Sequence, residues 1–112
     1  MTRFGFAPAV CAGLMLLLAS PAARAGDPVA GKKLYVANCA ACHGIEGTAV
    51  LVYAPSFARG ERFDKDDAAL IVSVRDGIYR MPPLGGYLTE SQIADAIAYA
   101  RTLRKPGNAA GR

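Results

Sequence analysis

The sequence predicts a small all-α domain, and three observations favour this class. Apolar residues recur at helical spacing in three segments, at residues 28–38, 65–76 and 90–103. Residues that commonly cap or end helices stand at the boundaries of these segments. No internal repeat, no alternating βαβ pattern and no convincing strand alternation is present. The 112 residues fit a single domain.

Residues 1–25 are predicted to be a cleaved signal peptide. Arg3 supplies a positive charge, residues 9–19 are continuously apolar, and ARA at residues 23–25 is an A-x-A cleavage site. An apolar run of 11 residues is too short to cross a hydrocarbon core that needs roughly 20. An uncleaved anchor is therefore disfavoured, and we expect an exported product without stable membrane insertion.

The mature protein is predicted to be a domain at residues 26–105 with a flexible tail at 106–112. Cleavage would leave 87 of the 112 residues, and a chain this short commonly needs a disulfide, a metal or a cofactor for stability. Loss of Arg3 and Arg24 lowers the net charge from +4 to +2. Because no block of like charges is present, we expect no nucleic-acid partner.

The first helix is predicted to begin at Pro28 and to end near Asn38. Asp27 is a suitable N-cap, and proline is favoured in the first turn that follows such a cap. Apolar residues of this segment recur at helical spacing, at Ala30, Leu34 and Ala37. The helix therefore leads directly into the cysteine pair that follows it.

The segment NCAACHG at residues 38–44 places two cysteines before a histidine, and three chemistries compete for this spacing. A zinc site normally takes four ligands, but the mature chain would offer only Cys39, Cys42 and His43. A redox dithiol is expected within a βαβ pattern, which this sequence lacks. A plain disulfide would leave His43 without a role.

The pattern C-x-x-C-H is, in contrast, the signature of c-type haem attachment, and it requires all three residues. The two thiols add to the vinyl groups of the haem, and the adjacent imidazole is placed to bind the iron. We therefore predict one covalent haem c, attached through Cys39 and Cys42, with His43 as an iron ligand. Such a haem would also stabilise the small core.

The middle of the chain is predicted to be a loop followed by a second helix. Glycines and a proline interrupt residues 44–60. The apolar stretch at 49–54 is compatible either with a short strand or with a loop at the haem edge. Asp64 is the expected N-cap of a helix at 65–76, and Gly77 is expected to end it.

Met81 is predicted to be the second iron ligand. The ligands that proteins offer to haem iron include His, Met, Cys and Tyr, and the mature chain has no second histidine or free cysteine. Met1 and Met15 leave with the signal peptide, so that Met81 is the remaining methionine. It lies in the loop YRMPPLGG, whose prolines and glycines favour a rigid turn. The alternative is a methionine that fills the core.

The last helix is predicted from its cap and its buried face. Thr89 and Gln92 match a capping box. Apolar residues then recur at the spacing of one buried helix face: Ile93, Ala96, Ile97, Ala100 and Leu103.

This order of helix, CAACH, proline-bearing loop, helix, Met-Pro loop and final helix resembles small bacterial class I cytochromes c. The resemblance covers nearly the whole mature chain. It implies that the N- and C-terminal helices cross around one covalently bound haem. A glycine at the position of Gly31 lets the helices cross closely in that family, and Tyr99 occupies the place of the aromatic crossing partner.

The resemblance also implies a role for Pro55. In the family, a proline carbonyl at this position accepts the Nδ1 proton of the haem histidine, which orients the ring and tunes its basicity. The family often has Gly-Pro-x-Leu here, whereas this chain has APSF, with Ala54 and Phe57.

Binding of the iron by both His43 and Met81 would leave no position open for a substrate. The sequence therefore predicts a monomeric, periplasmic electron carrier rather than an enzyme. It would move one electron between respiratory partners such as a reductase, an oxidase or a dehydrogenase, either as a shuttle or as a subunit of one complex. The alternative is a small haem enzyme or gas sensor in which Met81 is not bound and the sixth position is open.

Overall fold

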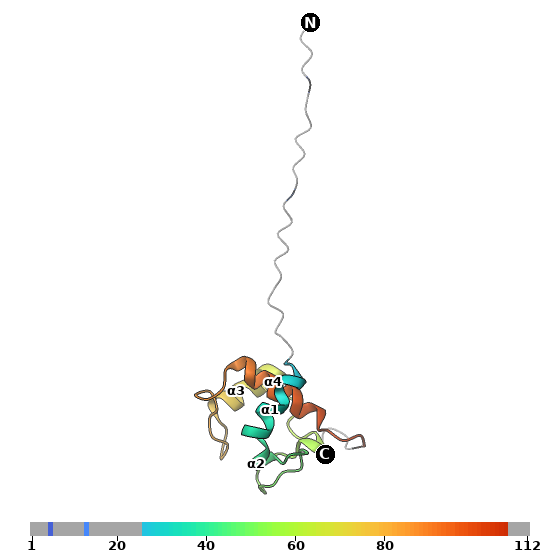
Figure 1. Cartoon of the computed structure of the whole chain (residues 1–112), viewed down its shortest axis with the longest axis vertical. Coiled ribbons are helices and arrows are strands. Elements are labelled where there is room, and N and C mark those ends of the chain that lie inside the picture. The colour runs from blue at the N-terminus through green and yellow to red at the C-terminus, as the bar shows by residue number, and fades with distance from the viewer. Residues whose placement is uncertain (1–4, 6–12, 14–25, 108–112) are drawn as a thin grey trace.

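The computed structural model describes Gly5, Gly13 and residues 26–107, and within this part of the chain the fold is helical (Figure 1). The elements are α1 (Pro28–Asn38), α2 (Ala40–His43), the 3-10 helix η1 (Phe57–Arg59), α3 (Asp67–Asp76) and α4 (Glu90–Thr102). Among the described residues, β-pairing is limited to one isolated bridge between Ile78 and Met81. The expected all-α class is confirmed. The predicted cleavage site and residues 108–112 of the predicted tail lie outside the described residues.

Helix α1 begins as its sequence predicts. Asp27 is extended, and its side chain accepts a hydrogen bond of 2.9 Å from the backbone N–H of Val29. Pro28 stands in the first turn, where a missing N–H costs nothing. At the other end, the Cys39 N–H still donates to the Tyr35 carbonyl. The first cysteine of the motif is therefore fixed by the end of α1.

Helix α3 begins later than expected, and the prediction that Asp64 caps it is wrong. Asp66 is the cap, and its carboxylate accepts a 2.8 Å hydrogen bond from the Ala69 N–H. The preceding segment is a turn in which Arg62 has a left-handed φ of 72°. Because Asp64 belongs to this turn, the chain becomes helical only after it. The helix ends at Gly77, as predicted, with a φ of 80°.

Helix α4 has the predicted cap and the predicted buried face. The Gln92 N–H donates to the Thr89 hydroxyl over 3.1 Å, and the Thr89 N–H donates to the Gln92 side chain over 2.9 Å. These two bonds form a complete capping box. Of the five residues expected on the buried face, four are buried and Leu103 is partly exposed.

Helices α1 and α4 cross in direct backbone contact, within the folded part in the lower half of Figure 1. A Cβ atom added to Gly31 would overlap the carbonyl of Asp95 and meet the backbone nitrogen of Ala96. The close crossing expected at Gly31 is therefore present, but the backbone of α4 provides the contact. Tyr99 lies about one turn farther along α4 and packs against the ring of Tyr35, with 5.3 Å between centroids.

The core lies where α3, α4 and the chain between them meet. It centres on Ile93, Ile97 and Leu88, and partly buried side chains pack against these residues: Leu34, Leu70, Ile71, Val74 and Leu84. Helix α4 packs on both α1 and α3. The chain segments between them, and the loop after α3, surround the site described below.

Replacing Gly31 by alanine is expected to lower the free energy of unfolding. An alanine inside a helix is ordinarily better than glycine by about 1 kcal/mol. At Gly31 the added methyl group must push α4 away, and overpacking of this kind typically costs roughly 1 to 3 kcal/mol. The measurement is the denaturant midpoint of the variant.

Lys32→Ala is the matched control for Gly31→Ala, because Lys32 is an exposed residue of the same helix. We expect its midpoint to stay near that of the parent. A midpoint for Gly31→Ala equal to or above the parent value would contradict the close crossing.

Candidate haem site

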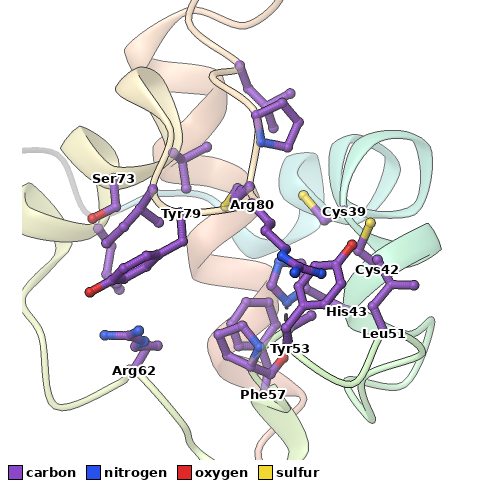
Figure 2. Close-up of a pocket in the computed structure, with 18 of the residues that line it drawn as sticks. Cys39, Cys42, His43, Leu51, Tyr53, Phe57, Arg62, Ser73, Tyr79 and Arg80 are labelled. Atoms are coloured by element: carbon purple, nitrogen blue, oxygen red, sulfur yellow. Dashed lines mark hydrogen bonds between the residues drawn. The ribbon is translucent and has the colours of Figure 1, made fainter.

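The structure contains a cavity of about 850 Å³ that brings the predicted site residues together (Figure 2). Its wall is built from the end of α1, from α2, from the loop before η1, from α3 and from the loop after α3. All five residues singled out in the sequence line it: Cys39, Cys42, His43, Pro55 and Met81. The volume falls within the range of ~300 to 1,000 Å³ that is usual for ligand sites.

Two cysteine thiols lie at the wall of this cavity, one helical turn apart. Cys39 ends α1, and the N–H groups of Cys42 and His43 both donate to its carbonyl, over 3.3 and 2.9 Å. Both side chains are free thiols, partly buried at Cys39 and exposed at Cys42. Burial, together with the neighbouring Cys42, raises the pKa of the Cys39 thiol to about 11. Because both thiols are free, both sulfur atoms are available for attachment.

The imidazole of His43 is buried and held in one tautomer. Only 7% of the residue is exposed, and Nδ1 lies 3.0 Å from the Pro55 carbonyl oxygen. Since a carbonyl only accepts, Nδ1 carries the proton, and the neutral ring keeps a lone pair on Nε2. This is the state in which an imidazole binds a metal.

The helical turn that carries His43 is tied to α1 by a tyrosine. Tyr35 is fully buried, and its hydroxyl donates a 2.6 Å hydrogen bond to the carbonyl of Gly44. Burial raises the pKa of the Tyr35 phenol above its ordinary value, and the nearby Cys39 and Tyr99 add to this effect. The phenol therefore stays protonated and keeps donating at physiological pH.

Met81 reaches the cavity from a tight turn after α3. The backbone groups of Ile78 and Met81 exchange two hydrogen bonds, of 3.2 and 2.9 Å, with Tyr79 and Arg80 at the tip. The Leu84 N–H then returns to α3 and donates to one of its last carbonyls over 2.9 Å. These bonds hold Met81 in position independently of any ligand.

The apolar stretch at 49–54 is a loop, which decides between the two alternatives left open by the sequence. Val50 and Val52 are exposed, and Tyr53 lines the cavity. The guanidinium of Arg80 lies over the Tyr53 ring, 4.9 Å from its centroid. This cation–π contact joins the Met81 turn to the 49–54 loop at the wall of the cavity.

Three cationic residues that were not among the predicted site residues also line the cavity: Arg62, Lys65 and Arg80. Their charges complement the carboxylate groups that a haem carries. The rest of the wall is mainly apolar, including side chains of α3. A covalently attached haem fits this set of groups: two free thiols, an imidazole with a free nitrogen, a thioether and an apolar wall with cations.

The family comparison agrees with this chemistry. The family model described as "Cytochrome C oxidase, cbb3-type, subunit III" matches residues 26–99. The chain belongs to the class I cytochromes c. This class I cytochrome c is a small haem electron carrier with one haem c bound covalently through Cys39 and Cys42.

Curated relatives and solved structures support the same assignment. Cytochrome c6 of Thermosynechococcus vestitus is 38% identical over 96 residues, which cover 80% of this chain and 84% of the relative. Cytochrome c6 of Diacronema lutheri is 30% identical over 77 residues, covering 66% of this chain and 93% of the relative.

Among solved structures, cytochrome c6 of the diatom Phaeodactylum tricornutum has a TM-score of 0.59 at 30% identity. The match covers 69% of this chain and 93% of the other. The KustC0563 c-type cytochrome has a TM-score of 0.60 at 27% identity, covering 67% of this cytochrome and 98% of the other chain.

Phe57 is a further residue of the site that sequence reasoning missed. Its ring stacks on the imidazole of His43, with centroids 4.4 Å apart and planes 14° apart. One signal was present, because the family resemblance implies leucine at position 57, where this chain has phenylalanine. Nothing in the sequence indicated that the two rings would be parallel.

None of the helices within residues 26–107 is long and apolar enough to cross a membrane.

Proposed function

We propose that this cytochrome is a monomeric periplasmic carrier of single electrons whose iron is bound by His43 and Met81. The observation that carries the proposal is that both residues line one cavity while backbone hydrogen bonds fix the segments that hold them. The haem, when bound, supplies the one-electron chemistry. The residues of the chain orient the iron ligands and keep water away from the site.

His43 and Pro55 act as a pair in this proposal. The Pro55 carbonyl keeps the proton on Nδ1 of His43, so that Nε2 is left as the metal-binding atom. The same bond orients the ring and increases its basicity as a ligand. Pro55 therefore belongs to the site although it does not itself bind the iron.

Met81 supplies a thioether, which favours the reduced state and raises the reduction potential. The two hydrogen bonds between Ile78 and Met81 hold the turn in one conformation. Because neither ligand segment depends on a flexible loop, little rearrangement should accompany a change of charge. Apolar side chains of the wall, such as Leu70 and Val74, keep water away and favour the state of lower charge.

The setting we propose is the bacterial periplasm, with residues 1–25 removed on export and 106–112 as a flexible tail. The match to a family described as a subunit of a cbb3-type oxidase supports respiratory partners. We propose a reductase, an oxidase or a dehydrogenase as donor or acceptor. Both a free shuttle and a dedicated subunit would use the same electron-transfer site.

The test of the ligation is a visible spectrum of the purified ferric protein. A bond between iron and the Met81 sulfur is expected to give a weak far-red band, and the ferrous protein is expected to resist carbon monoxide at neutral pH. Absence of the band together with ready binding of carbon monoxide would show an open sixth position. The haem enzyme or gas sensor would then be the better hypothesis.

A further inference from the structure

Three aromatic rings form a continuous stack that begins at the imidazole of His43. The Phe57 ring lies against the imidazole, 4.4 Å away between centroids and tilted by 14°. The Phe63 ring stacks in turn on the Phe57 ring, with centroids 5.1 Å apart and planes 18° apart. Figure 2 shows Phe57 beside His43, below the labelled cysteines. The stack therefore connects the proposed iron ligand to the turn before α3.

The far end of this stack is anchored to α3 and α4. The guanidinium of Arg101 lies over the Phe63 ring, 5.2 Å from its centroid. Arg101 itself is fixed by Asp67, whose carboxylate accepts from Nε over 2.9 Å, and by the carbonyls of Phe63 and Lys65. Phe63 is thus held in place behind Phe57 by contacts outside the haem cavity.

A second contact holds Phe57 from the side. The buried ring of Tyr35 lies 6.2 Å from the Phe57 ring between centroids, at an angle of 57°. Tyr35 is itself fixed by its bond to Gly44. Phe57 therefore has a defined orientation before any cofactor is considered.

The hydrogen bond to Pro55 and the stack restrain the imidazole in different ways. The Nδ1–H···O contact directs one edge of the ring toward Pro55, but a hydrogen bond tolerates a range of angles, so it restrains the tilt of the ring plane only loosely. A flat partner parallel to the ring restrains the plane, because offset stacking falls off as the two planes tilt apart. The orientation of the His43 ring plane thus depends on the stack as well as on the hydrogen bond.

We propose that Phe57, supported by Phe63, is a positioning residue that sets the orientation of the His43 ring plane. This inference rests on the proposed role of His43 as the iron ligand. Leucine, which the family often has at this position, presents no flat face to the imidazole. The ring plane of His43 in this chain is therefore expected to differ from the plane that a leucine would allow.

The test is the ferric holoprotein of Phe57→Leu, compared with the parent by proton nuclear magnetic resonance. In a low-spin ferric haem, the shifts of the haem methyl protons depend on the orientation of the axial ligands. We expect Phe57→Leu to change the order and the spread of these methyl shifts. Because the variant restores a residue common in the family, we expect it to fold and to bind haem.

Tyr99→Leu is the matched control. It also replaces an aromatic ring by leucine in the same cluster, since Tyr99 packs on Tyr35. No ring contact joins it to His43 among the described residues. We expect Tyr99→Leu to lower the melting temperature and to leave the methyl-shift pattern of the parent intact.

Unchanged methyl shifts in Phe57→Leu would overturn this inference, as would equal changes in both variants. A parent protein without the low-spin spectrum of His/Met ligation would instead overturn the proposed function and this inference together. The two failures are therefore distinguishable from the parent spectrum alone.

Discussion

Replacing Cys39 and Cys42 together by alanine is expected to yield a protein that loses its haem on acid–acetone extraction. The parent should keep the haem in the protein pellet, because two thioether bonds survive denaturation. The double variant should also be poorly folded, since a cavity of about 850 Å³ with a mainly apolar wall would be left to water. Extraction and the melting profile measure the two effects.

Ala41→Ser is the matched control for the cysteine variant. Ala41 is an exposed residue between the two cysteines, and the substitution leaves both thiols in place. It should retain the haem through extraction. A stable, fully folded apoprotein from the double variant would show that the haem is not needed to stabilise this fold.

Replacing Met81 by alanine is expected to lower the reduction potential and to open the iron to carbon monoxide. The thioether favours ferrous iron, and no other free sulfur would remain in the mature chain. The shift should be a sizeable fraction of the ~0.8 V range over which axial ligands set haem potentials. Potentiometric titration and the ferrous carbon monoxide spectrum are the measurements. Lys65, which lines the cavity, is a candidate replacement ligand.

Met81→His shows whether an effect of Met81→Ala comes from loss of the sulfur atom or from loss of a sixth ligand. A histidine would restore a sixth ligand with a harder nitrogen atom, so the potential should still fall while carbon monoxide stays excluded. A parent potential unchanged in Met81→Ala would contradict ligation by Met81. Met81 would then be a residue of the turn that fills the wall of the cavity.

The starts of α1 and α4 could be predicted from their capping residues. Asp27 and Thr89 each bond to an N–H within three residues, and both caps are present as expected. The start of α3 was missed because it depends on the left-handed turn at Arg62, which is unusual for an arginine. Propensity rules favour glycine and asparagine in that conformation and give no reason to expect an arginine there.

The cavity could be predicted in composition but not in geometry. Residue chemistry and chain order predicted His43 and Met81 as ligands, and the family resemblance implied the role of Pro55. The stacking of Phe57 depends on how η1 and the turn before α3 fold back on α2, which involves contacts distant in the sequence. For the same reason the sequence did not indicate that the backbone of α4 at Asp95 is what meets Gly31.

The two attachment points lie three positions apart, within a single helical turn. A cross-link stabilises a protein by lowering the conformational entropy of the unfolded chain. This effect grows with the logarithm of the number of residues in the loop that it closes, and the loop here is very short. The stability that the haem confers must therefore come from contacts in the folded state. A dissociable ligand stabilises according to its free concentration, whereas a tethered haem has an effective concentration that dilution does not change. Refolding from denaturant should accordingly be a first-order process, equally fast at all protein concentrations.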